Sequence, residues 1–236
     1  MNTHADNVSD EELAKFEAHS GDWWNPRGPL RPLHAMNPVR LSYLQALTPL
    51  DGREILDAGC GGGILAEAMA RCGARVTGVD ASAGAIGAAR AHLAGTDLQI
   101  DYRVCTAEQL AESGGARFDA VTCMELLEHV PDPGSLLAAC AMLLRPGGHL
   151  VLSTINRTLR AYLGAVLGAE YLLRLLPRGT HDYARFIRPS ELEHWLRACG
   201  LELMDVTGIR YLPWVDHCAL SQDPSINYIA HARLKD

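Results

Sequence analysis

The chain has 236 residues, of which 48% are hydrophobic and 21% are charged. This composition is typical of globular proteins and argues against a disordered, collagenous or coiled-coil chain. The net charge of −7 argues against a nucleic-acid partner, because nucleic-acid binders are usually basic. The seven cysteines are odd in number and include no Cys-x-x-Cys pair, which predicts reduced thiols in the cytoplasm.

The beginning of the chain predicts helices and loops rather than strands. Ser9-Asp10-Glu11-Glu12 has the pattern of a capping box and starts a helix. Residues 22–38 are rich in proline and glycine, which predicts a loop, and residues 40–47 predict another helix. We therefore expect residues 1–53 to form an N-terminal helical cap.

From residue 54 onward, short apolar strands alternate with helices. Strands are predicted at 55–58, 74–79, 98–104, 118–124 and 150–154, and helices at 64–72, 83–93 and 133–144. After an interruption at 156–188, we expect a helix at 189–199 and strands at 201–207 and 227–232. The alternation predicts an α/β fold with a mostly parallel central sheet and helices on both faces. We expect residues 1–236 to form one domain.

A glycine-rich turn, Asp57-Ala58-Gly59-Cys60-Gly61-Gly62-Gly63, joins the first predicted strand to a helix. Glycines allow a tight turn and the close approach of a ligand to the backbone. Asp80 follows the second strand, where a carboxylate can accept hydrogen bonds from both hydroxyls of a ribose. The alternative is a tight turn without a ligand. A dehydrogenase is disfavoured, because Ile64 occupies the position of the last glycine in the dinucleotide fingerprint.

The turn Asp-x-Gly-x-Gly-x-Gly resembles the first motif of the Rossmann-like methyltransferases that depend on S-adenosylmethionine (SAM). Two later segments also resemble that superfamily, namely residues 118–123 and the Pro-Gly-Gly turn at 146–148. The resemblance implies a Rossmann-like fold and SAM as the cofactor.

More specific stretches resemble the ubiquinone biosynthesis O-methyltransferase family, from about Asn7 to His231. They include Asn37-Pro38-Val39-Arg40, Ser153-Thr154-Ile155-Asn156-Arg157 and Gly179-Thr180-His181-Asp182. The resemblance implies O-methylation of phenolic, polyprenylated ubiquinone precursors, at both O-methylation steps of the pathway. It also implies a polyprenyl phenol or quinol as the substrate and other ubiquinone-biosynthesis proteins as partners.

The resemblance assigns the SAM contacts to particular residues. The assigned cofactor-binding residues are Arg40, Gly59, Gly61, Asp80 and Met124. Arg40 is expected to pair with the carboxylate of the methionine moiety, because a guanidinium fork matches a planar anion. A solvated arginine at the start of a helix is the alternative reading. Met124 is expected to pack on the adenosine.

Glu125, Glu128 and His129 follow the fourth predicted strand and can share one face of a helical turn. Two carboxylates and an imidazole suit a divalent ion, which predicts a magnesium site that would lower the pKa of a bound phenol. The alternative is that the glutamates interact favourably with a helix dipole and bind no metal. His129 is also the candidate catalytic base, because its ordinary pKa suits that role.

Residues 156–188 form an insert with a net charge of +4, from six arginines and two acidic residues. Apolar runs lie between the arginines, which predicts either an interfacial helix on an anionic lipid surface or a substrate lid. We therefore expect a cytoplasmic protein, peripheral on the inner face of the membrane in the first case. The alternative functions are methylation of another small phenol and a catalytically silent module that binds SAM or a lipid surface.

Overall fold

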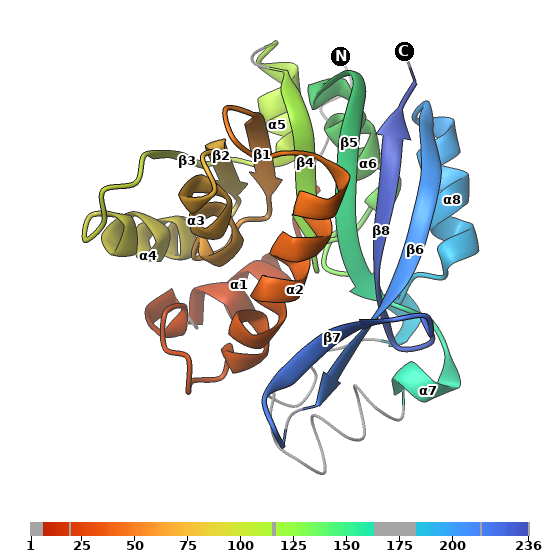
Figure 1. Cartoon of the computed structure of the whole chain (residues 1–236), viewed down its shortest axis with the longest axis horizontal. Helices are drawn as coiled ribbons and strands as arrows, with labels where there is room; N and C mark the ends of the chain where they lie inside the picture. The colour runs from red at the N-terminus through yellow and green to blue at the C-terminus, as the bar shows by residue number, and fades with distance from the viewer. Residues whose placement is uncertain (1–6, 19, 115–116, 163–182, 213, 236) are drawn as a thin grey trace.

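The computed structural model describes residues 7–18, 20–114, 117–162, 183–212 and 214–235. At its centre lies an eight-stranded sheet with the strand order β3-β2-β1-β4-β5-β8-β6-β7 (Figure 1). The strands are β1 (Glu54–Ala58), β2 (Arg75–Asp80), β3 (Ile100–Val104), β4 (Phe118–Met124), β5 (Leu144–Ile155), β6 (Leu201–Leu212), β7 (His217–Ser221) and β8 (Asn227–Leu234).

The first five strands of the chain are parallel, and the last three are antiparallel to their neighbours in the sheet. β1 pairs with β2 and β4, β2 also pairs with β3, and β4 also pairs with β5. β8 inserts between β5 and β6, and β7 forms a hairpin with β6. The predicted α/β fold with a mostly parallel sheet is therefore confirmed. β7 was not predicted, because its five residues alternate between polar and apolar only weakly.

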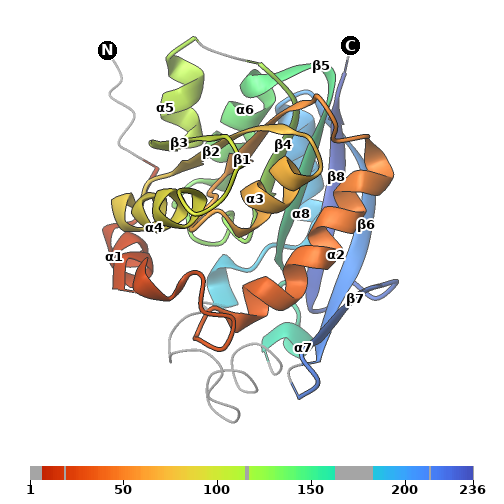
Figure 2. The same ribbon diagram turned by 60° about the vertical axis from the view of Figure 1, so that its left-hand side comes forward.

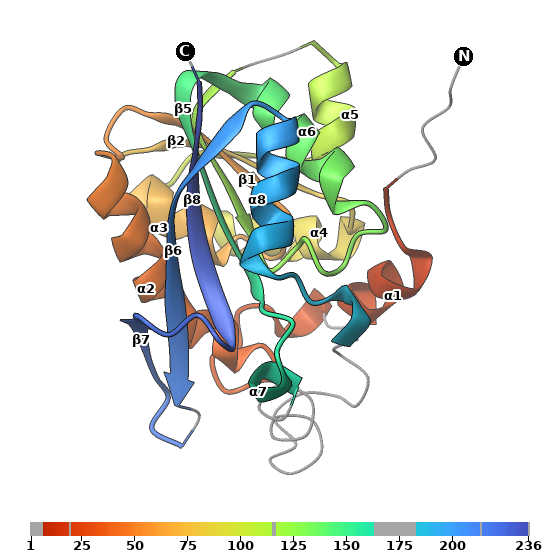
Figure 3. The same ribbon diagram turned by 90° about the vertical axis from the view of Figure 1, so that its right-hand side faces the viewer.

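Helices cover both faces of the sheet (Figures 2 and 3). They are α1 (Asp10–Ala18), α2 (Arg31–Leu47), α3 (Ile64–Arg71), α4 (Ala83–Leu93), α5 (Ala107–Glu112), α6 (Pro133–Leu143), α7 (Leu159–Ala161) and α8 (Pro189–Ala198). Side chains of α2, α3 and α4 pack on one face with Ile55, and those of α5, α6 and α8 pack on the other with Leu56. Successive strand residues point to opposite faces, so both sides of β1 are buried.

The loop predicted at residues 22–38 is wrong for its last eight residues, because α2 already begins at Arg31. Pro32 lies in the first turn of the helix, where its missing N–H has no partner to lose. Pro38 lies inside α2 and costs one helical hydrogen bond. The burial of Met36, Tyr43 and Leu44 against the sheet offsets that cost.

Two further differences from the predicted elements follow from local sequence. α5, which was not predicted, is capped by Thr106, whose side chain forms a capping box with Gln109. β5 begins at Leu144, six residues earlier than predicted, and its register with β4 shifts between Phe118 and Ala120 beside the Pro-Gly-Gly segment.

The predicted insert at 156–188 is described only at its two ends. α7 and a short 3-10 turn at Tyr183–Arg185 belong to it, and residues 163–182 lie outside the described residues. Within the described part of the chain, no helix combines the length and the apolar character needed to cross a membrane.

Candidate active site

The glycine-rich turn follows β1 and leads into α3. Gly59 and Gly61 have φ angles of 69° and 53°, in the left-handed region that favours glycine. A Cβ at Gly59 would lie 2.8 Å from Cδ2 of Leu126, and a Cβ at Gly61 would overlap the indole of Trp23. The sequence predicts that a ligand lies close to the backbone of this turn. In the structure, side chains of the protein itself take up part of that space.

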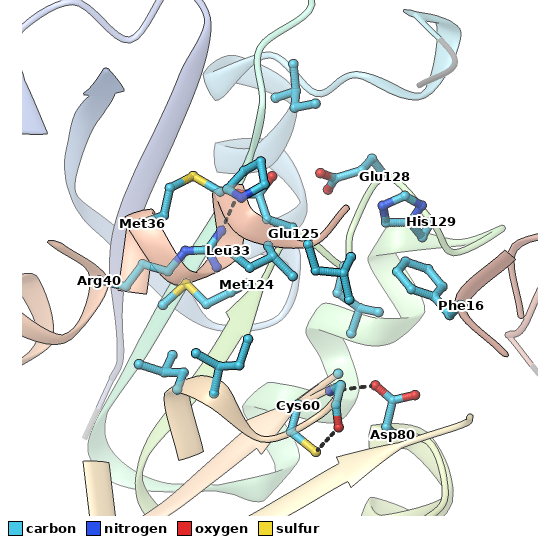
Figure 4. Close-up of a pocket in the computed structure, with 18 of the residues that line it drawn as sticks. Phe16, Leu33, Met36, Arg40, Cys60, Asp80, Met124, Glu125, Glu128 and His129 are labelled. Carbon is cyan, nitrogen blue, oxygen red and sulfur yellow. Dashed lines mark hydrogen bonds and ion pairs between the residues drawn. The ribbon is translucent and has the colours of Figure 1, made fainter. Parts of the chain in front are cut away.

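Asp80 ends β2 and is held by the backbone around it. Its Oδ2 accepts a hydrogen bond from N–H of Gly61 at 2.9 Å (Figure 4), and its Oδ1 accepts one from N–H of Ser82 at 2.8 Å. Burial raises the pKa of Asp80, and the two backbone hydrogen bonds oppose that shift. These contacts fix both carboxylate oxygens at the wall of a cavity, where each retains lone pairs for a ligand.

A single cavity of about 1030 Å³ runs from this turn to the β6–β7 hairpin. Gly59, Gly61, Asp80 and Thr106 line it at one end, and Ile209, Leu212 and Trp214 at the other. Arg40, Met124 and Glu125 also contribute to its wall. The structure therefore brings all five residues predicted to bind the cofactor to one cavity.

Arg40 projects from α2 into this cavity, with only 5% of its surface exposed. Its Nη2 lies 3.1 Å from Oε1 of Glu125, and Figure 4 shows the two side chains facing each other. Nε and Nη2 of Arg40 are buried without a hydrogen-bond partner in the part of the chain that the structure describes. The solvated-arginine alternative is therefore wrong. Unsatisfied buried donors are costly, which favours an anion as the missing partner.

Asp57 is a further buried carboxylate of the turn, and it also lines the cavity. Its Oδ1 accepts a hydrogen bond from Oγ1 of Thr122 at 2.7 Å. Burial raises the pKa of Asp57 to about 6, although the Thr122 hydrogen bond and the charge of Arg40 act in the opposite direction. Asp57 therefore holds the turn to β4 and places a second acidic group near Arg40.

Glu128 lies in the segment between β4 and α6, and its carboxylate is buried. Its Oε2 accepts a hydrogen bond from Oγ1 of Thr154 on β5 at 2.7 Å. Burial raises the pKa of Glu128 to about 7, and the neighbouring carboxylate of Glu125 adds to the shift. Glu128 can therefore exchange a proton near neutral pH.

His129 follows directly and is held by the N-terminal helix. Its Nδ1 lies 2.7 Å from Oε2 of Glu12, and the ring of Phe16 meets its imidazole edge-on. The hydrogen bond to His129 lowers the pKa of Glu12 to about 2. Burial opposes the charged imidazolium, but Glu12 and Glu128 outweigh it and raise the pKa of His129. Because Nδ1 is engaged by Glu12, Nε2 of the neutral ring is the nitrogen that can take a proton from a ligand.

The three predicted magnesium ligands have separate partners. Glu125 contacts Arg40 and Ser153, Glu128 contacts Thr154, and His129 contacts Glu12. Among the described residues, no group of three or more histidine, cysteine or acidic side chains is arranged to hold a metal ion. As they stand, these residues do not fit a magnesium ion, because one carboxylate is already neutralised by Arg40.

Several residues of the site were not found by sequence reasoning. Glu12, Phe16 and Trp23 come from the N-terminal segment, and Ser153 and Thr154 come from β5. Ser153 and Thr154 lie in the family-specific stretch Ser-Thr-x-Asn-Arg, which could have identified them as site residues. No local pattern identifies Glu12, since its partner His129 lies 117 positions further along the chain.

Comparisons with known proteins agree with this fold. A family model described as a methyltransferase domain matches residues 34–206. Solved structures with the same fold include the magnesium protoporphyrin IX methyltransferase of Synechocystis, with a TM-score of 0.65 and 21% identity over 86% of this chain and 84% of that one. A methyltransferase of Methanosarcina mazei has a TM-score of 0.61 and 21% identity over 82% of this chain and 97% of that one.

Curated relatives are much more similar in sequence. The ubiquinone biosynthesis O-methyltransferase of Alkalilimnicola ehrlichii is 54% identical over 95% of this chain and 92% of its own length. The protein of the same name from Coxiella burnetii is 51% identical over 98% of both chains. The stretches singled out in the sequence and the relatives matched over nearly the whole length lead to one assignment: the chain belongs to the ubiquinone biosynthesis O-methyltransferase family.

Proposed function

We propose that this chain transfers the methyl group of SAM to phenolic hydroxyls of polyprenylated ubiquinone precursors, at both O-methylation steps. The observation that carries the proposal is the single cavity that joins Asp80 and the buried donors of Arg40 to the β6–β7 hairpin, where Ile209, Leu212 and Trp214 lie among polar lining residues. Family membership at 54% identity supports the same reaction. The cavity provides one region for a polar nucleoside and another for a lipid-like substrate.

The residues present fit SAM. Within the described residues, Nε and Nη2 of Arg40 have no hydrogen-bond partner, and a carboxylate would satisfy them. Asp80 has its oxygens fixed for the ribose hydroxyls, and Met124 ends β4 at the cavity wall, where it can pack on the adenosine. When bound, SAM supplies a methyl group activated by the positive sulfur.

The protein must hold the phenol oxygen in line with that methyl group and help to remove the phenol proton. Alignment of the reactants alone can be worth roughly 7–11 kcal/mol. A free phenol has a pKa of about 10, so a base is needed near neutral pH. His129 is the proposed base: Glu12 holds Nδ1, which fixes the ring, and Nε2 accepts the phenol proton. No step in this proposal uses a metal ion.

A methyl-transfer assay with labelled SAM and a short-chain demethylubiquinol tests the proposal. Methylated quinol is the expected product. Turnover only with other small phenols would instead assign a different substrate. SAM binding without turnover on any phenol would leave a catalytically silent binding module.

We also propose that the chain docks on an anionic membrane surface near the hairpin end of the cavity. Trp214 and Val215, just after β6, are 73% and 63% exposed, and Leu159 on α7 is 70% exposed. Oγ1 of Thr158 donates a hydrogen bond to the carbonyl of Ser225, which ties α7 to the loop after β7. Figures 1 and 3 show α7 and the hairpin at the same end of the molecule.

This arrangement places exposed apolar side chains beside the cavity that would receive a prenyl tail, because Trp214 also lines it. Flotation with phosphatidylglycerol vesicles tests the docking. The double variant Trp214→Ser and Val215→Ser is expected to bind fewer vesicles than the wild type. The control Met142→Ser changes an apolar residue on α6 that is 59% exposed, and it should bind normally. Equal binding by all three proteins would reject this surface.

A further inference from the structure

The ion pair between Arg40 and Glu125 occupies the place where the proposed function puts the cofactor's carboxylate. Nη2 of Arg40 and Oε1 of Glu125 are 3.1 Å apart, and both side chains are largely buried. The contact is an ion pair that lacks the alignment of a hydrogen bond, so no described residue satisfies Nε and Nη2 of Arg40. Arg40 is therefore neutralised but incompletely bound.

Glu125 is held toward Arg40 by two contacts with β5. Its N–H donates a hydrogen bond to the carbonyl of Ser153 at 2.9 Å, and its Oε1 accepts one from Oγ of Ser153 at 2.6 Å. Its φ of 51° is unusual for a residue other than glycine. Such conformations persist where the surroundings enforce them, and they cluster at functional sites.

We propose that Glu125 is an internal competitor for the cofactor's carboxylate. It holds the guanidinium of Arg40 in the cavity until SAM binds, and then gives up that position to the carboxylate of SAM. The reason is electrostatic: two carboxylates at one guanidinium repel each other, and the repulsion is strong where water is excluded. This inference rests on the proposed function, in particular on Arg40 as the carboxylate partner.

The displaced carboxylate would remain in the cavity beside Glu128, whose pKa its charge already helps to raise. The same residue that neutralises Arg40 in the free protein would therefore become available to the phenol only after SAM has bound. Glu125 acts in this scheme as a positioning residue that couples the two binding events.

The experiment compares two ligands by titration calorimetry in buffer with EDTA. S-adenosylhomocysteine carries the carboxylate and the ammonium of its amino acid moiety, whereas methylthioadenosine has the same adenosine and sulfur without either group. Glu125→Gln removes the competing charge with little change in shape. We expect it to bind S-adenosylhomocysteine about tenfold more tightly than the wild type, since a repulsion between close charges is lost. Its affinity for methylthioadenosine should be unchanged.

Two further variants make the test independent of folding and of general charge. Glu125→Gly also removes the carboxylate, but it tolerates the positive φ, so it should show the same gain. Glu128→Gln removes a neighbouring carboxylate that contacts Thr154 instead of Arg40, and it should show a much smaller gain. Unchanged or weaker binding of S-adenosylhomocysteine by both Glu125 variants would overturn the inference. An equal change for both ligands would do the same.

Arg40→Lys separates this inference from its premise. It should weaken the binding of S-adenosylhomocysteine and not that of methylthioadenosine, because an ammonium lacks the guanidinium fork. If it affects neither ligand, Arg40 does not bind the carboxylate, and the competition fails with that assignment. The methyl-transfer assay is independent of the calorimetric results for the Arg40 and Glu125 variants. A failure of the proposed reaction can therefore be distinguished from a failure of this inference.

Discussion

Gly61 offers a direct test of how the glycine turn is built, because two different costs attach to a side chain at that position. Its φ of 53° disfavours any residue with a Cβ. A Cβ would also lie 2.6 Å from Cζ3 and 2.8 Å from Cζ2 of Trp23, far inside the usual carbon contact distance of about 3.5–4.0 Å. We therefore expect Gly61→Ala to destabilise the protein through both effects.

The two costs can be given magnitudes separately. The left-handed conformation costs about 1–2 kcal/mol for a residue with a Cβ. Overpacking against a well-packed neighbour costs about 1–3 kcal/mol. Gly61→Ala should then lower the free energy of unfolding by about 2–5 kcal/mol. Gly52→Ala is the matched control, since its φ is 71° but no atom of the described residues lies within 4 Å of a Cβ at this position, so it should cost only the first amount.

Urea unfolding followed by circular dichroism measures both variants, alone and combined with Trp23→Leu. The leucine lacks the ring atoms that the new Cβ would meet, so Gly61→Ala should cost about 1–3 kcal/mol less in that background. An equal cost in both backgrounds would refute the reasoning. Unchanged stability together with weaker SAM binding would restore the sequence-based reading, in which a ligand needs the space above Gly61.

Three further outcomes are expected. Asp80→Asn should weaken SAM binding by about 10-fold to 150-fold in titration calorimetry, because hydrogen bonds to a charged group are worth about 1.5–3 kcal/mol. Burial raises the pKa of Glu128 from 4.5 to about 7, so the folded state favours its neutral form. The stabilisation that comes from the protonated Glu128 is complete below about pH 4.5 and is lost as the pH rises through 7. The free energy of unfolding of Glu128→Gln, measured by urea unfolding relative to wild type, should therefore increase between about pH 5 and pH 8. A constant difference would contradict this sign. EDTA should leave methyl transfer unchanged, since the three predicted ligands have other partners; activity lost with EDTA and restored by magnesium would show that they leave those partners.

The sheet and its ligand-binding edge were predictable because their signals are local. The strand β1 is a short apolar run followed by Gly59, and β2 ends at Asp80, so both can be located without knowing their partners in the sheet. The start of α2 was not predictable in the same way. Proline punctuation at 32 and 38 favours a loop, and only the packing of the helix on the sheet overrides it.

The site residues also combine features that local sequence predicts with features that depend on the fold. Arg40, Met124 and Glu125 were found through stretches of sequence, but sequence spacing also placed Glu125, Glu128 and His129 together as metal ligands. Sequence spacing identifies candidate site residues, but it does not show which residues they contact. Those partners are Arg40 on α2, Thr154 on β5 and Glu12 on α1, three elements that only the fold brings to the end of β4.

The contacts of the N-terminal helix α1, which only the fold reveals, have a functional consequence. α1 and Asn7, which precedes it, are fixed by hydrogen bonds to three separate segments of the Rossmann-like body. The bonds join Asn7 to Glu108, Glu12 to His129, and Glu17 to Ser82 and Gly84. The segments they reach follow β3, β4 and β2, which are the edges where the cofactor is expected. α1 is therefore a wall of the cavity rather than an appendage beside it, and the proposed base His129 owes its orientation to a residue of this helix.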